Sequence, residues 1–312
     1  MAILFTEVLP REEKLFRESL LPVHTIYFSR ASLSEISLKE YDNITCVCIG
    51  LQSTITQSIL EQLPQLKLIV TRTTGFDHLD LNMLRKTNIV ACNIPSYAAI
   101  SVAEQVFALI LALSRRITEC AKRVKEGSFS CENLEGFELY RKTLGIIGTG
   151  KIGKQVITLA AGFNISILAY DLRVDPECEQ KSYARYVSLP ELYSQSDIIS
   201  LHLPLTKDTF HMCNEKIFSQ LKKGVYIINT ARGALIDTHA LIKALQDNII
   251  AGCGLDVLEK KYHFDKYLLS HSRVIITPHN AFNTHEAHKR LVYATINTIN
   301  AWYAGTPINV IQ

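Results

Sequence analysis

Three glycines in the middle of the chain constrain its fold more than any other feature. Gly148, Gly150 and Gly153 have the spacing GxGxxG, directly after the apolar run 144–147 and before the amphipathic run 155–161. In a strand–turn–helix unit the first glycine permits a tight turn, the second lets the backbone approach a pyrophosphate, and the third lets helix and strand pack closely. The N-terminus of such a helix also attracts phosphates. The pattern therefore predicts a doubly wound α/β unit that binds a dinucleotide.

An acidic residue stands where a dinucleotide site selects its cofactor. Asp171 ends the next expected strand, about twenty residues beyond the glycine turn, where a carboxylate accepts hydrogen bonds from the adenosine ribose. A carboxylate there also repels a 2′-phosphate, which favours NAD over NADP. Arg173, two residues further on, weakens this preference. The alternative interpretation, a glycine-rich turn with a surface aspartate, is disfavoured because strand, glycines, helix and acid all occur in order.

Short apolar runs alternate with amphipathic runs along the whole chain, which is typical of parallel βαβ units. Further strands are expected at residues 2–5, 45–49, 66–71, 89–92, 165–169, 198–201, 224–229, 252–255 and 274–277, with helices at 53–63, 79–86 and 286–303. Ser101 is expected to open a long apolar helix, because Glu104 stands three positions later in a capping-box pattern.

The composition excludes several other classes of protein. A chain of 312 residues with 47% hydrophobic and 20% charged residues suits two folded domains. The formal net charge is only +3 and no basic arm is present, so we expect no nucleic-acid partner. No apolar run reaches the roughly twenty residues of a membrane span, and no signal peptide is evident. The eight cysteines form no CxxC pair, so we expect reduced thiols in a cytoplasmic protein and no metal site.

Three later segments carry a resemblance to a known family. They read Ile-Ile-Asn-Thr-Ala-Arg-Gly at 227–233, Gly-Leu-Asp-Val at 254–257 and Thr-Pro-His-Asn-Ala at 277–281. Together with the glycine turn they resemble the D-isomer specific 2-hydroxyacid dehydrogenases, most closely the D-lactate dehydrogenase branch, from about residue 66 to the C-terminal helix. The resemblance implies an NAD-dependent oxidoreductase that reduces a small 2-keto acid to a D-2-hydroxy acid, with pyruvate and D-lactate as the first candidates.

The same resemblance implies the architecture. It predicts an α/β fold of two Rossmann-like, doubly wound parallel-sheet domains with the active site in the cleft between them. Residues 1–100 plus 281–312 would form the substrate-binding domain, and residues 101–280 the NAD-binding domain. Members of the family pair through the region of the long helix, so a homodimer is expected.

The side-chain chemistry of two residues, Arg232 and His279, suits keto-acid reduction. Arg232 follows an expected strand, and a guanidinium can bind a carboxylate and a carbonyl in a planar, bidentate way. His279 follows Pro278 at another strand end, where α/β sheets present ligands. As imidazolium it can donate a proton to the carbonyl oxygen, and as imidazole it can take one back. A lone Arg or His after a strand is more often structural. Here the match to the family pattern favours catalytic roles for both residues.

The resemblance also assigns the remaining site residues. Thr74, Gly75 and Tyr97 would bind the substrate together with Arg232: the first two through backbone N–H groups to the carboxylate, and the tyrosine by closing over a small substrate. Besides the three glycines and Asp171, the cofactor would contact Lys151, Ile152, Leu203, Pro204, Thr209, Thr230, Ala231 and Asp256.

One position departs from the family pattern. The family places a glutamate, which raises the pKa of the catalytic histidine, five residues beyond the aspartate that corresponds to Asp256. This chain has Lys261 there. Glu259 or Asp265 could take the place of that glutamate, or the site could work without it.

Alternatives to the first hypothesis stay open. One alternative is a non-catalytic protein that senses NAD(H). Lys261 supports it, whereas the presence of both Arg232 and His279 disfavours it. Another branch of the enzyme family, reducing glyoxylate, hydroxypyruvate or phosphoglycerate, is the other. The chain has no long C-terminal extension of the kind found in phosphoglycerate dehydrogenases, which disfavours that member.

Overall fold

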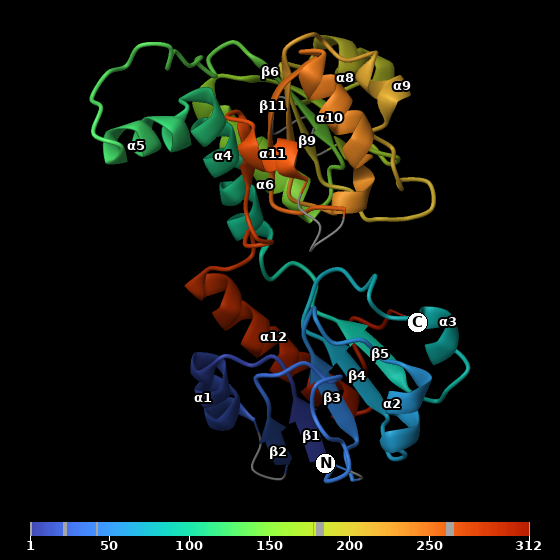
Figure 1. The fold of residues 1–312 in the computed structure, drawn as a ribbon. Coiled ribbons are helices and arrows are strands. Elements are labelled where there is room, and N and C mark those ends of the chain that lie inside the picture. The colour runs from blue at the N-terminus through green and yellow to red at the C-terminus, as the bar shows by residue number, and fades with distance from the viewer. Residues whose placement is uncertain are drawn as a thin grey trace. The chain divides into compact units, whose positions relative to one another are not determined.

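The computed structural model describes residues 2–20, 24–41, 43–176, 178, 184–259 and 265–311. Contacts within the chain divide it into two compact units (Figure 1). Unit 1 consists of Met1–Ala98 and Asn283–Gln312, and unit 2 of Ala99–Phe282. Each unit is an α/β structure built on its own parallel sheet, as the fold class predicted from the sequence requires.

The sheet of unit 1 contains, within the described residues, five parallel strands in the order β2-β1-β3-β4-β5. Their bounds are β1 Ala2–Phe5, β2 Thr25–Phe28, β3 Cys46–Ile49, β4 Leu68–Thr71 and β5 Val90–Asn93. The strands β1, β3 and β4 are buried along their whole length, as expected for strands covered on both faces. The chain runs from β1 to β2 on one side and then returns to β3 on the other, so the strand order reverses between β1 and β3.

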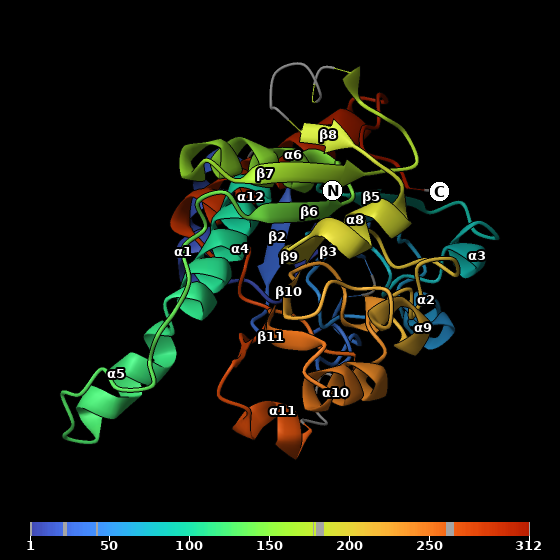
Figure 2. The same cartoon turned by 90° about the horizontal axis from the view of Figure 1, so that it is seen from above.

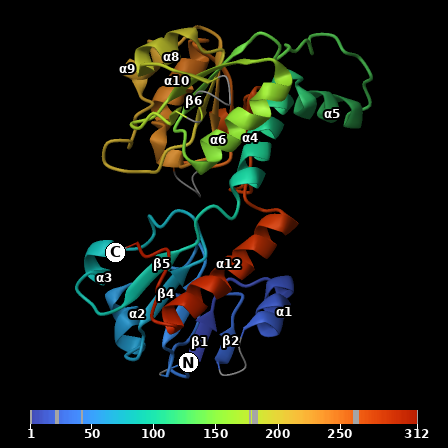
Figure 3. The ribbon, with the colours of Figure 1, turned by 180° about the vertical axis from the view of Figure 1, so that it is seen from behind.

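Helices cover both faces of this sheet (Figures 1 and 3). On one face lie α1, Pro10–Ser19, and α12, His285–Tyr303, which pack against each other. On the other lie the short helices α2, Gln57–Gln62, and α3, Leu81–Leu84, whose Ile59 and Leu84 join a core with Leu4, Val47 and Ile69.

The sheet of unit 2 contains seven described parallel strands in the order β12-β11-β10-β9-β6-β7-β8. Their bounds are β6 Thr143–Ile147, β7 Ser166–Tyr170, β8 Ala184–Tyr186, β9 Ile198–Leu201, β10 Val225–Asn229, β11 Ile250–Leu255 and β12 Val274–Ile276. The order reverses between β6 and β9, which pair directly. In open α/β sheets this is the switch point, where ligands bind beyond the carboxyl ends of the strands.

Two layers of helices enclose this second sheet. The helices α4, Ala99–Ser114, and α6, Lys151–Ala160, pack together on one face. On the other face lie α8, Leu189–Gln195, α9, Glu215–Phe218, and α10, Thr238–Gln246, while α11, Lys266–Ser270, lies next to β12. The helix α5, Ile117–Lys125, buries none of its residues and projects from the body of unit 2 (Figure 2).

The structure corrects several details of the sequence-based expectation. The long helix α4 begins at Ala99, so Ser101 is a buried residue inside its first turn and the predicted capping box is wrong. The helix expected at 53–63 is shorter, because Thr56 caps it by accepting a hydrogen bond from the Ile59 N–H at 3.3 Å. The strands β2 and β8 were not predicted, since both are short edge strands that are largely half-buried or exposed.

Candidate functional site

The glycine turn has the backbone geometry that the motif requires. Gly148 has φ +98°, and a Cβ there would lie 2.6 Å from the carbonyl oxygen of His202. A Cβ on Gly153 would lie 2.0 Å from the carbonyl oxygen of Gly148, so only glycine lets α6 pack this closely on the turn. Gly150 is the N-cap of α6 and faces open space, with nothing within 4 Å of an added Cβ. The turn thus leaves a cradle of backbone at the N-terminus of α6, where Lys151 is exposed and Ile152 half-buried.

Asp171 follows β7, the strand next to β6, and its carboxylate is held beside the glycine turn. Its Oδ2 accepts the N–H of Thr149 at 2.6 Å and the Thr149 hydroxyl at 3.2 Å. Its Oδ1 accepts the N–H of Arg173 at 3.3 Å. Hydrogen bonds from Thr149 and Arg173 therefore orient this carboxylate at the carboxyl edge of the sheet.

The loop after β9 lies on the other side of the switch point. His202 donates its N–H to the Ile147 carbonyl at 2.8 Å, which joins the exits of β9 and β6. Burial lowers the pKa of the His202 imidazole to about 4, so the ring is neutral at physiological pH. Further along, the Thr209 hydroxyl donates to the Pro204 carbonyl at 2.7 Å and closes the loop, while Leu203 packs on the core of unit 2.

Arg232 sits in a turn directly after β10. The turn is braced by the buried side chain of Asn229, which accepts the Ala231 N–H at 3.0 Å and donates to the Arg232 carbonyl at 2.9 Å. Gly233 is required here, because an added Cβ would lie 2.0 Å from the backbone carbon of Leu258. The hydroxyl of Thr230 is buried without a hydrogen-bond partner in the described structure, as expected of a group that faces a bound ligand.

The loop that carries His279 is held by one buried carboxylate. Asp256, which follows β11, accepts the hydroxyl of Thr277 and the N–H of Asn280 at 2.8 Å on Oδ1, and the N–H of Ala281 at 3.0 Å on Oδ2. Its carbonyl accepts the His279 N–H at 2.8 Å. His279 itself has φ +55°, in the left-handed region that few non-glycine residues adopt. The structure thus uses Asp256 to fix the backbone on both sides of the imidazole.

Both carboxylate oxygens of Glu259 are bonded to residues other than His279. Its Oε1 lies 2.8 Å from Nε2 of His211, and its Oε2 accepts the Thr238 hydroxyl at 2.7 Å. Burial alone would raise the pKa of Glu259, but the hydrogen bonds from Thr238 and His211 outweigh burial and lower it. Asp265 instead caps α11 through the Tyr267 N–H at 2.8 Å. Lys261 lies outside the described residues, and the role expected for it stays a prediction.

The proposed substrate loop of unit 1 follows β4 and is fixed by hydroxyl groups. Thr73 lies 2.6 Å from the Thr71 hydroxyl and donates to the Gly75 carbonyl at 2.5 Å. The Thr74 carbonyl accepts the side-chain amide of Asn93 at 2.7 Å. These bonds use the carbonyl oxygens of Thr74 and Gly75 rather than their N–H groups. Tyr97 is buried in unit 1, and its carbonyl accepts the guanidinium of Arg290 at 2.7 Å.

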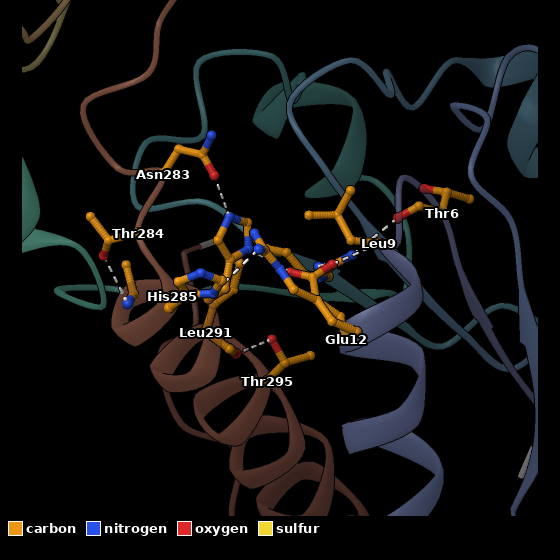
Figure 4. A network of polar contacts seen from close by, with 12 residues as sticks. Thr6, Leu9, Glu12, Asn283, Thr284, His285, Leu291 and Thr295 are labelled. Atoms are coloured by element: carbon orange, nitrogen blue, oxygen red, sulfur yellow. Dashed lines mark hydrogen bonds and ion pairs between the residues drawn. The ribbon is translucent and has the colours of Figure 1, made fainter.

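A buried network of polar contacts joins α1 to α12 (Figure 4). Arg72 donates to Glu12 at 2.7 Å, with both side chains less than 5% exposed. The other carboxylate oxygen of Glu12 lies 2.8 Å from Nδ1 of His288, whose Nε2 lies 2.8 Å from the side-chain oxygen of Asn283. The network therefore connects α1 and α12 to Arg72, at the start of the substrate loop. It also includes Asn283, the first residue of the second segment of unit 1.

Sequence reasoning missed several residues that shape these loops. Asn229, Glu12, His288 and the pair of His211 with Glu259 were not singled out. Asn229 could have been suspected, since a buried polar residue at the end of an apolar strand needs a local partner. The others pair across 48 to 276 positions of the chain, and no local pattern signals such a pairing.

The described residues contain no group of three or more His, Cys, Asp or Glu side chains that could hold a metal ion. In the same part of the chain, no helix has the length and apolar character needed to cross a membrane.

Comparison with known proteins assigns the chain to a class. Residues 107–281 match the family model for the NAD binding domain of D-isomer specific 2-hydroxyacid dehydrogenases. The chain is 36% identical over 284 residues to D-lactate dehydrogenase of Escherichia coli, with 86% of each chain covered. It is 37% identical over 266 residues to glyoxylate reductase of Thermococcus litoralis, covering 83% of this chain and 80% of that one. Among solved structures, D-lactate dehydrogenase of Aquifex aeolicus with NAD and lactic acid aligns with a TM-score of 0.88 and 36% identity, over 97% and 96% of the two chains.

The chain therefore belongs to the D-isomer specific 2-hydroxyacid dehydrogenase family. It is an NAD-dependent oxidoreductase that acts on a CH–OH group, as the sequence predicted. The residues present fit NAD, because Gly150 at the N-terminus of α6 faces open space, and the buried Thr230 hydroxyl lacks a partner within the described chain.

Proposed function

We propose that the chain reduces a small 2-keto acid, pyruvate first, to the D-2-hydroxy acid. The observation that carries this proposal is a shared sheet edge. Arg232, Asp256 and His279 follow β10, β11 and β12, which are adjacent parallel strands, so all three emerge at the carboxyl edge that also carries the glycine turn and Asp171. Substrate and cofactor groups thus meet at one edge of one sheet.

The residues divide the chemistry between them. NAD, when bound, supplies the hydride acceptor or donor. Arg232 binds the carboxylate of the keto acid through its planar guanidinium, and we propose that the N–H groups of Thr74 and Gly75 also bind that carboxylate. His279, as imidazolium, donates a proton to the carbonyl oxygen as it gains negative charge, and in the reverse direction it takes that proton back.

The constrained backbone of the His279 loop serves this proton transfer. The bonds from Asp256 fix the residues before and after His279, so the ring needs little reorganisation to reach the substrate. Asp256 therefore holds the loop in addition to its proposed contact with the nicotinamide carboxamide. Lys151, Ile152, Leu203, Pro204, Thr209 and Ala231 keep their proposed roles as cofactor contacts.

Two features support a substrate with a small side chain. Tyr97, just before α4, is buried, and Phe76 of the substrate loop packs against the core of unit 1. We propose that these two bulky side chains limit the room for the side chain of the substrate. The similarity to both a D-lactate dehydrogenase and a glyoxylate reductase keeps glyoxylate as the second candidate.

The test is a comparison of kcat/KM with NADH for pyruvate, glyoxylate, hydroxypyruvate, oxaloacetate and phenylpyruvate. We expect the highest value for pyruvate. A higher value for glyoxylate or hydroxypyruvate would move the chain to another branch of the family. Bound NADH without turnover on any of these acids would favour the sensor alternative.

We also propose a homodimer that uses α5 and the segment after it. Ile117 and Val124 of α5 are 55% and 52% exposed, and Phe129 is 95% exposed, so an apolar surface stands uncovered on an arm of unit 2. Light scattering coupled to size exclusion should give twice the chain mass of 35.1 kDa. A monomer at micromolar concentration would reject this part of the proposal.

A further inference from the structure

A chain of hydrogen bonds leads from a tyrosine to the carboxylate of Asp171. The hydroxyl of Tyr186, at the end of β8, donates to the Thr149 hydroxyl at 2.8 Å. The Thr149 hydroxyl donates in turn to Oδ2 of Asp171 at 3.2 Å, and the Thr149 N–H donates to the same oxygen at 2.6 Å. Thr149 lies between the first two glycines of the turn, so the chain joins the glycine turn to the acid after β7.

The direction of these bonds is consistent along the chain. Each hydroxyl has one proton to donate, so a phenol that donates to Thr149 leaves the threonine proton for the carboxylate. Burial raises the pKa of the Tyr186 phenol, which keeps it protonated and able to donate. The phenol oxygen also accepts a backbone hydrogen bond from Asp175. The hydroxyl of Tyr186 therefore donates toward Thr149, and the hydroxyl of Thr149 toward Asp171.

One cation that follows the glycine turn already has an acidic partner. Lys154 directly follows Gly153, and its ammonium forms an ion pair with Asp175. A 2′-phosphate would need a cation to offset its charge next to Asp171. The residue that orients Tyr186 through its backbone thus also neutralises Lys154 through its side chain.

We propose that Tyr186 and Thr149 are positioning residues that set the preference for NAD over NADP. The terminal torsion of an aspartate is broad, so a carboxylate without these bonds samples several orientations. Held by Thr149 and Tyr186, both oxygens of Asp171 stay where they accept the ribose hydroxyls and repel a 2′-phosphate. This inference rests on the proposed role of Asp171 and goes beyond it, because it assigns the selectivity to a three-residue unit.

The test compares Thr149→Val with Thr149→Ser, using the ratio of kcat/KM for NADH to that for NADPH. Valine keeps the shape and the backbone N–H but removes the hydroxyl, so the ratio should fall about tenfold, the effect of losing one hydrogen bond to a charged group. Serine keeps the hydroxyl, and the ratio should stay within about twofold of the wild-type value. Tyr186→Phe, which leaves the glycine turn untouched, should lower the ratio about threefold.

The same variants in an Asp171→Ala background separate the inference from the role on which it rests. Asp171→Ala alone should lower the ratio more than Thr149→Val does, and Thr149→Val should then have no further effect. An unchanged ratio in Asp171→Ala would reject the role of Asp171 itself. A lowered ratio in Asp171→Ala with an unchanged ratio in both Thr149→Val and Tyr186→Phe would overturn the positioning role. Equal losses with NADH and NADPH would also overturn it, since a distorted turn affects both cofactors alike.

Discussion

The two sheets of this chain reverse their strand order in the same way but use the reversal differently. In unit 2 the switch point between β6 and β9 opens onto the glycine turn, where Gly150 faces open space. In unit 1 the switch point between β1 and β3 is filled by the chain itself. The carboxylate of Glu7, directly after β1, accepts the N–H groups of Gln52 and Ser53, each at 2.9 Å, and the Ser53 hydroxyl at 2.5 Å.

This difference explains why one doubly wound sheet binds a dinucleotide and the other need not. Backbone N–H groups beyond a parallel strand attract an anion in either unit. In unit 1 a carboxylate of the protein takes that place, and a Cβ on Gly50 would lie 2.4 Å from it. The switch point of unit 1 is therefore occupied by the chain itself, while that of unit 2 is open to a ligand.

The two units also hold their functional loops by different means. Unit 2 uses close backbone approaches at glycines and one buried carboxylate, Asp256, which accepts backbone N–H groups. Unit 1 uses a buried network of charged side chains, in which Glu12 joins Arg72 to His288. We expect substitutions in unit 2 to affect catalysis first, and substitutions in the network of unit 1 to affect stability first.

The largest effect is expected at His279. Replacing it by alanine removes the proton donor and should lower kcat by about 10²- to 10⁴-fold, with NADH affinity little changed. His239→Ala is the matched control, an exposed histidine in the first turn of α10, and should keep wild-type kcat. Stopped-flow fluorescence of NADH gives both quantities. A kcat within tenfold of wild type would contradict the proposed role of His279.

The second effect is expected at Glu12. Glu12→Gln leaves Arg72 as a buried, uncompensated charge and should lower the free energy of unfolding of unit 1 by about 3–5 kcal/mol. Glu13→Gln is the control on the same helix, because its ion pair with Arg17 is at the surface, and should change stability by less than about 1 kcal/mol. Urea unfolding measures both. Equal effects of the two variants would show that the network adds nothing to stability.

Glu12 also predicts how the stability of unit 1 depends on pH. Burial opposes ionisation, but the bonds from His288 and Arg72 outweigh burial and lower the pKa of Glu12 from 4.5 to about 2. Because the folded pKa lies below the unfolded one, the stabilisation is complete above pH 4.5 and is lost as pH falls toward 2. The wild-type chain should lose about 3 kcal/mol more than Glu12→Gln over this interval. Parallel pH profiles would contradict the lowered pKa.

The smallest of these effects is expected at Glu7. Glu7→Gln replaces charge-assisted hydrogen bonds at the switch point of unit 1 by weaker ones, so stability should fall by about 1–3 kcal/mol. The Kd for NADH should not change, because the cofactor belongs to unit 2. Thermal unfolding and an NADH titration test this. A weaker Kd for NADH would contradict the division of roles between the two sheets.

The sequence predicted the parts of the molecule that depend on the backbone. The glycine turn, the parallel sheets and the order of motifs follow from residues that are close in sequence and have few conformational alternatives. The network of Glu12, Arg72 and His288 could not be predicted, because its members are 60 and 276 positions apart and each could as well be a surface residue. The same holds for the Tyr186–Thr149 bond, which crosses the sheet from an edge strand that the sequence did not reveal.

The partners of the two acids offered in place of the family glutamate could not be predicted from the sequence either. Sequence reasoning identified the substitution at Lys261 and offered Glu259 or Asp265 as replacements. In the structure Glu259 is bonded to His211 and Thr238, which are distant in the sequence. Asp265 caps the first turn of α11.

We propose that this chain reduces a keto acid with defined stereochemistry. The most direct measurement incubates the protein with pyruvate and a limiting amount of NADH, and resolves the lactate on a chiral column. We expect D-lactate in a one-to-one ratio to the NADH oxidised. L-lactate, or oxidation of NADH without lactate, would contradict it.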